Sequence, residues 1–77
     1  MKYIYIYKTK VGEFQIVEKN GRWHIIFREE SLGSYTTPQQ ASDDVSGGHT
    51  FSPSSGVDPG KLGIPSDLSE WEIVVLK

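Results

Sequence analysis

The chain has no cysteine, so it can form no disulfide and offers no thiolate as a zinc ligand or nucleophile. A chain of 77 residues has room for one modest core, because a chain of this size buries only about 60% of its unfolded surface. We therefore predict a single domain over residues 1–77, whose core must suffice alone or be helped by self-association. The absence of cysteine is also compatible with a reducing cytoplasm.

Long hydrophobic runs are absent as well. The only apolar run near the start, Tyr3 to Tyr7, is closed by Lys8 and is too short for a signal-peptide core or a membrane span. We therefore expect a cytoplasmic protein with no membrane contact.

Positive charge is scarce in the second part of the chain. The net charge is −2, with +2 over residues 1–30 and −4 over residues 31–77. A protein that grips a nucleic-acid backbone carries a basic patch, so the net charge disfavours that partner. Residues 1–30 alone do not exclude it.

Alternating apolar and polar residues predict strands over residues 2–8, 13–18 and 22–29. Between the last two strands, Asn20-Gly21 is typical of a two-residue type I′ turn. This turn sets a register whose period of two gathers the natural core on one face: Phe14, Ile16, Trp23, Ile25 and Phe27. The other face receives Gln15, Val17, His24 and Ile26.

A helix is predicted over residues 38–46. Thr37 is the expected N-cap, Pro38 suits the first helical position, and Gln40 completes a capping box. Residues 47–65 are rich in Gly, Pro and Ser and predict a long loop. Its apolar side chains are spaced like anchors that would hold it on apolar surface: Phe51, Val57, Leu62 and Ile64.

Two further segments fit short strands. Residues 32–35 fit a turn or a fourth strand, and residues 71–76 fit a final strand. We therefore predict an α+β fold, with a three- or four-stranded antiparallel sheet, one α-helix packed on one face and a long Gly/Pro/Ser-rich loop.

No motif for catalysis or metal binding is recognisable. His49 lies near Asp43 and Asp44 in the sequence, but no spacing matches a zinc site, a calcium loop or a nucleophile elbow. We predict no cofactor and no catalytic or metal-binding residue. A small metal-dependent or hydrolytic enzyme around these three residues is the remote alternative.

Tyr3, Tyr5 and Tyr7 share one face of the first predicted strand and are candidate binding residues, since tyrosine combines apolar area with a polar tip. Left bare, they would bind a peptide, a base or another subunit; alternatively, the loop over residues 46–66 covers them. The remaining candidate binding residues are Arg22, Arg28, His49 and Phe51.

Part of the chain resembles the plant ethylene-response-factor-type DNA-binding domain. The residues that carry the resemblance are Gly21-Arg22-Trp23 and Leu32-Gly33-Ser34-Tyr35-Thr36-Thr37-Pro38-Gln39-Gln40-Ala41. The resemblance implies a three-stranded antiparallel sheet followed by a helix, with DNA read by arginine and tryptophan side chains on the sheet.

The whole chain looks more like a family of short bacterial proteins with no assigned activity. The similarity includes residues 47–53 and 62–71. From the residues themselves we predict a small noncatalytic binding or accessory module for a protein partner. The alternative is a nucleic-acid-binding module that uses the sheet.

Overall fold

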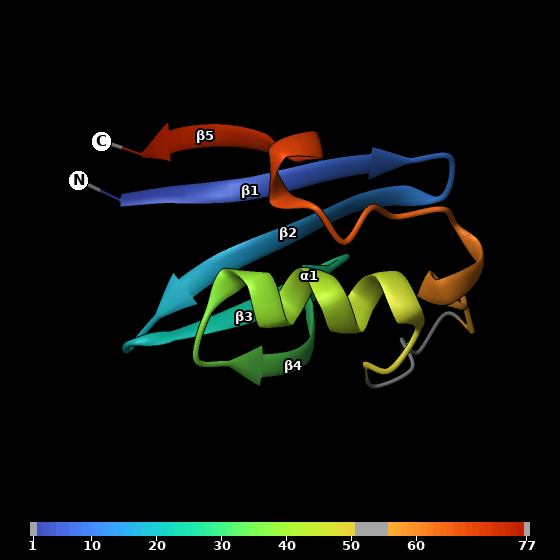
Figure 1. Ribbon diagram of the computed structural model, residues 1–77, viewed down its shortest axis with the longest axis horizontal. Coiled ribbons are helices and arrows are strands. Elements are labelled where there is room, and N and C mark those ends of the chain that lie inside the picture. The colour runs from blue at the N-terminus through green and yellow to red at the C-terminus, as the bar shows by residue number, and fades with distance from the viewer. Residues whose placement is uncertain (1, 51–55, 77) are drawn as a thin grey trace.

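The computed structural model describes residues 2–50 and 56–76 and has the α+β fold that the sequence predicts (Figure 1). Its main elements are β1 (Lys2–Thr9), β2 (Gly12–Lys19), β3 (Arg22–Phe27), β4 (Glu30–Tyr35), α1 (Pro38–Gly47) and β5 (Glu72–Leu76). The strands form one antiparallel sheet in the order β4-β3-β2-β1-β5. The sheet therefore has five strands, and the predicted number of three or four was too low.

The turn between β2 and β3 has the predicted geometry. Asn20 and Gly21 have φ of 55° and 79°, and Ile16 lies opposite Ile25 as expected. The predicted strand over residues 22–29 is two residues too long, because Arg28 and Glu29 have φ of 52° and 67° and form a second tight turn into β4. Arg-Glu lacks the glycine that usually marks such a turn, so local sequence rules do not predict it.

The helix α1 begins and ends close to the predicted residues. Thr37 accepts a hydrogen bond from the Gln40 backbone N–H, and Gly48 closes the helix in the left-handed conformation with φ of 73°. The capping box differs in one detail. The Gln40 side chain accepts from the backbone N–H and hydroxyl of Thr36, one residue before the N-cap, at 3.2 and 2.7 Å.

The core lies between the sheet and a second layer on one of its faces. This layer consists of α1, which contacts β2, β3 and β4, and of the segment 56–71, which passes over β1 and β2 (Figure 1). The buried apolar side chains come from both layers: Phe14, Ile16, Ile25, Phe27, Leu32, Ala41, Val45, Ile64 and Trp71.

The segment 56–71 is held by apolar and polar contacts. Ile64 is buried, and Val57 and Leu62 pack against the core, whereas Phe51 lies outside the described residues. A short 3-10 turn, Pro59–Lys61, follows Asp58, and a second one, Leu68–Glu70, precedes β5.

Asp67 caps the turn Leu68–Glu70 by accepting from Ser69, and these hydrogen bonds lower the pKa of Asp67. The Ser66 carbonyl bonds to α1, accepting from Ser42 Oγ at 2.7 Å and from Gln39 Nε2 at 2.8 Å. Trp71 precedes β5 and points into the core, where its indole N–H donates to the Pro65 carbonyl at 2.9 Å. The final strand is therefore one residue shorter than the predicted 71–76.

Candidate functional site

The sheet has two faces, and α1 and the segment 56–71 both pack on the same one. We call the opposite face the open face. Its centre is apolar, although neither α1 nor the segment 56–71 packs on it. Two rows of opposed residues cross it: Val74, Ile4, Val17, His24 and Ser34 in one, and Glu72, Ile6, Gln15, Ile26 and Ser31 in the other. Its five aliphatic side chains are half-buried and none belongs to the core cluster: Ile4, Ile6, Val17, Ile26 and Val74.

The open face is hollowed over β2 and β3. One hollow of about 570 Å³ is lined by Gln15, Val17, Lys19, His24, Ile26, Glu29 and Ser31. A second one of about 270 Å³ adjoins it and shares Gln15, Ile26 and Glu29. The Gln15 amide donates to Glu13 at 2.7 Å, which orients both side chains along the floor. The site is thus a shallow apolar floor with a few polar groups.

Basic side chains border this floor. By the strand register, Lys2, Lys8, Lys19 and Arg22 belong to the open face, against the acidic Glu13 and Glu72. Arg22 is fixed by Ser34, donating to its hydroxyl at 3.1 Å and its carbonyl at 3.2 Å. The end of the sheet with Lys2, Lys19 and Arg22 therefore carries an excess of positive charge, whereas Lys8 at the other end lies beside Glu13 and Glu72.

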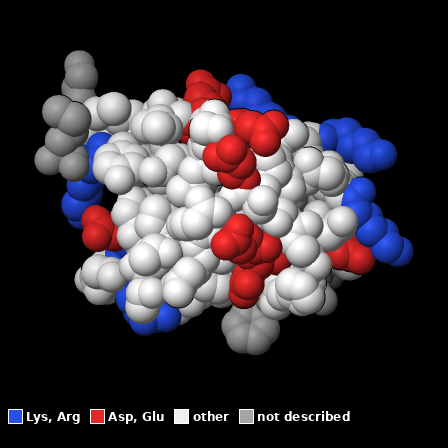
Figure 2. Space-filling model, in the orientation of Figure 1, with Lys and Arg blue, Asp and Glu red and all other residues white. Residues whose placement is uncertain are grey.

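The helix side has the opposite charge. Acidic atoms gather near the middle of this side, whereas basic atoms lie at its rim (Figure 2). The acidic residues of α1 and the segment 56–71 all belong to this layer: Asp43, Asp44, Asp58, Asp67 and Glu70. The weak net charge of the chain thus conceals a separation of charge between the two faces.

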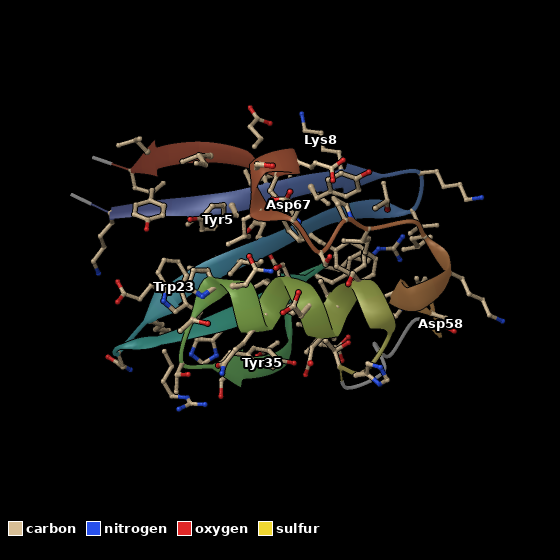
Figure 3. The ribbon with its side chains drawn as sticks, in the orientation of Figure 1. Tyr5, Lys8, Trp23, Tyr35, Asp58 and Asp67 are labelled. Carbon is tan, nitrogen blue, oxygen red and sulfur yellow. The ribbon has the colours of Figure 1, made fainter. Side chains whose placement is uncertain are left out.

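The three candidate tyrosines lie on the helix side and not on the open face. Tyr5 and Tyr7 pack against the core, with the ring of Tyr5 6.1 Å from Trp23 and that of Tyr7 5.6 Å from Trp71. Figure 3 shows Tyr5 and Trp23 on the side of the sheet that carries α1. Burial, followed by the Tyr3 hydroxyl, raises the pKa of Tyr5. Only Tyr3 is more exposed, at 38%. Tyr5 and Tyr7 therefore do not form a bare ladder with Tyr3, and the rings that contact them, Trp23 and Trp71, lie outside the loop over residues 46–66.

The other candidate residues are not brought together. Arg22 and Arg28 flank opposite ends of β3, and Arg28 donates to the Val11 carbonyl at 2.7 Å while it lies 5.2 Å from the Phe27 ring. His49 follows α1 on the helix side. Phe51 lies outside the described residues.

His49 lines a hollow of about 350 Å³ beside β4, together with Tyr35 and Asp44. Burial, followed by a hydrogen bond to Asp44, raises the pKa of Tyr35 to about 12. Asp43 does not line this hollow and accepts instead from Gln39 Nε2 at 2.9 Å. Over residues 2–50 and 56–76, no three His, Asp or Glu side chains converge as metal ligands.

Sequence reasoning did not select the open-face aliphatics as a site, although the signal was present. The predicted register already placed Val17 and Ile26 away from the core, and Ile4 and Ile6 alternate with the tyrosines. Apolar residues at both alternations indicate a strand with two apolar faces.

No family model matches this chain, and no curated protein or solved structure matches it either. Within the part of the chain that the structure describes, no helix has the length and apolarity needed to cross a membrane.

Proposed function

We propose that the protein is a noncatalytic binding module whose open face docks a protein partner carrying an apolar segment with acidic residues at one end. The observation that carries the proposal is the apolar centre of the open face. An antiparallel sheet with one solvated face normally alternates apolar inward and polar outward residues. Here Ile4, Ile6, Val17 and Ile26 occupy outward positions and form a continuous patch, and such patches mark interaction sites.

The border of the patch specifies the chemistry of the partner. Lys2, Lys19 and Arg22 lie near one end of the strands, whereas Lys8 lies near the other end beside Glu13 and Glu72. A partner with acidic residues at one end of an apolar segment would match the basic end, and such matching raises association rates and selectivity. A second copy docked face to face would oppose these positive charges to one another.

A nucleic acid is the second candidate, favoured by the excess of positive charge on the open face. The resemblance of residues 21–41 to a DNA-binding domain also favours it. Against it, the centre of the open face is mostly aliphatic, and its Gln15 amide already donates to Glu13. Trp23, which would stack on a base, packs against the core on the helix side. A protein partner therefore explains both the aliphatic centre and the basic residues of the open face, whereas a nucleic acid explains only the basic residues.

The experiment is an NMR titration of the full chain with two synthetic amphipathic peptides. Both have the same leucine face, flanked by glutamate in one peptide and by lysine in the other. We expect the glutamate peptide to shift amide resonances around Ile4, Val17 and Ile26 and the lysine peptide to leave them unchanged. Ile26→Glu, which places a charge on the floor of the hollow, should weaken binding of the glutamate peptide by more than about tenfold.

A matched pair of charge reversals provides the control. Lys19→Glu on the open face and Lys61→Glu in the segment 56–71 change the net charge equally, and both side chains are exposed. Lys19→Glu should weaken binding of the glutamate peptide by about two- to fivefold, as expected for a surface ion pair, and Lys61→Glu should change it less. Equal effects of the two variants, or no shift at the open face with either peptide, would contradict the proposal.

A duplex DNA titration distinguishes the second candidate. Open-face shifts with DNA that disappear steeply as salt rises, without any shift from the glutamate peptide, would replace the protein partner by a nucleic acid.

A further inference from the structure

The two edges of the sheet differ in how well they are protected. The edge strand β4 contains a bulge opposite Ile25 and Ile26, and the Arg22 side chain donates a hydrogen bond to the Ser34 carbonyl. The hollow lined by Tyr35, Asp44 and His49 also adjoins it. Such features block the addition of a further strand. The edge strand β5 pairs regularly with β1, and Ile73 to Leu76 contain no charge, proline or glycine.

The exposed large apolar side chains of the described residues all lie at the β5 edge. They are Ile73 at 57%, Val75 at 55%, Leu76 at 42% and Tyr3 at 38%. Tyr3 lies directly opposite Val75 on the neighbouring strand, so Tyr3, Val75 and Ile73 form one patch on the helix side, whereas Leu76 lies on the open face. An edge strand with this composition is a template for pairing with another strand.

We propose that β5 pairs antiparallel with β5 of a second copy, so that two chains share one continuous ten-stranded sheet. A two-fold axis perpendicular to the sheet leaves the helix sides of the two copies on the same side of the shared sheet. Helix-side residues of one β5 must therefore lie opposite helix-side residues of the other, and open-face residues opposite open-face residues. The register that pairs all five residues of β5 places Val74 opposite Val74 of the second copy and Ile73 opposite Val75 of the second copy.

This register matches side chains on both faces. On the helix side, one apolar row crosses the boundary between the two chains. It runs from Tyr3 and Val75 of one chain to Ile73 and Tyr5 of the second copy. On the open face, Ile4 and Val74 continue into Val74 and Ile4 of the second copy. Glu72, the only charge of β5, faces Leu76 of the second copy and not another Glu72. The strand is therefore self-complementary, which identifies a second copy as its occupant.

The first measurement is the mass of the full chain in solution as a function of concentration, by sedimentation equilibrium. We expect the mass to rise from one chain to two chains below about 1 mM. Ile73→Lys and Val75→Lys place a charge on the edge and should each keep the protein monomeric at the concentrations at which the natural chain is dimeric. Both side chains are more than half exposed, so the monomer fold tolerates the change. Ser31→Lys is the matched control, since it adds a lysine to the exposed surface of the other edge strand and should leave the dimer unchanged.

The second measurement tests the register directly, because the chain has no cysteine of its own. Val74→Cys places two thiols opposite each other across the axis, at a Cα separation of about 5 Å that a disulfide spans. Val75→Cys places them roughly 8 Å apart, beyond that reach. Oxidation should link the first variant into a dimer and leave the second unlinked.

Three results would overturn the pairing. They are a single-chain mass up to about 1 mM, a dimer that survives both lysine variants, and equal crosslinking of the two cysteine variants. None of these results depends on whether a partner binds the open face.

Discussion

At the scale of single residues, Tyr35 is the group whose titration reports on the fold. Its hydroxyl is half-buried at the β4 edge and bonds to Asp44, and its pKa of about 12 lies above the ordinary value of 10.0. The neutral phenol is therefore favoured by folding. Its contribution to the free energy of unfolding is complete below pH 10 and is lost as pH rises from about 10 to about 12.

Tyr35→Phe removes this titration together with the hydrogen bond to Asp44. We expect the variant to be less stable at neutral pH by about 1 kcal/mol, since it loses one hydrogen bond. The difference between the two proteins should shrink as pH approaches about 11, because Tyr35 then ionises in the unfolded natural chain while it stays largely neutral in the folded one. Urea denaturation at neutral pH and at about pH 11 measures both differences. A difference that does not change with pH would contradict the assignment.

Individual residues also show where local sequence rules apply and where they do not. Asn20-Gly21 fixes its turn and register because few other residue pairs adopt positive φ at both positions. Ser66 and Asp67 are both residue types that commonly cap a helix, so local rules do not choose between them. The structure uses Asp67 because the Ser66 carbonyl is engaged by Ser42 and Gln39 of the helix, a contact between residues distant in sequence.

At the scale of elements, α1 and the segment 56–71 are joined through the Ser66 carbonyl. Ser42 is buried and donates to it, and Gln39 donates to it from a more exposed position. Removing one donor leaves the carbonyl with one partner, whereas removing both leaves it with neither.

A double-mutant cycle tests this joint. Ser42→Ala should lower the free energy of unfolding by about 1 kcal/mol and Gln39→Ala by less. The double variant should lose more than the sum, by about 0.5 kcal/mol or more, because only then is the carbonyl without either donor. Thermal or urea denaturation of the four proteins gives the coupling. If the losses of the two single variants simply add up in the double variant, the two donors are not coupled, and water bonds to the Ser66 carbonyl when they are removed.

The elements also differ in how far the sequence predicts them. The hairpin of β2 and β3 and the helix α1 depend on local signals, and both match the structure closely. The pairing of β5 with β1 joins the two ends of the described chain, and no local pattern specifies it. For the same reason the sequence does not show which side chains surround the tyrosines of β1. Tyr5 contacts Trp23 and Tyr7 contacts Trp71, and both tryptophans are distant from them in the sequence.

At the scale of the whole molecule, a domain of this size has one core, and the segment 56–71 contributes to it directly. Ile64 and Trp71 belong to the same buried cluster as Phe14 and Phe27. The segment is therefore a structural layer, although most of it has no regular secondary structure. If it were a separate lid, it would open without disturbing the sheet. If it is part of the core, it unfolds with the sheet.

Ile64→Ala distinguishes these two behaviours. Ile64 is 4% exposed, and truncating a buried isoleucine to alanine costs about 2–4 kcal/mol. We expect the whole domain to lose this stability, with one urea transition seen alike by tryptophan fluorescence and by amide resonances of Ile16 and Ile25 in the sheet. Val57→Ala is a milder control, since Val57 is only half-buried. A variant that loses the Trp71 signal early while the sheet resonances persist would show that the segment opens by itself. The helix side would then be a surface that the segment can uncover, with Tyr7 beneath it.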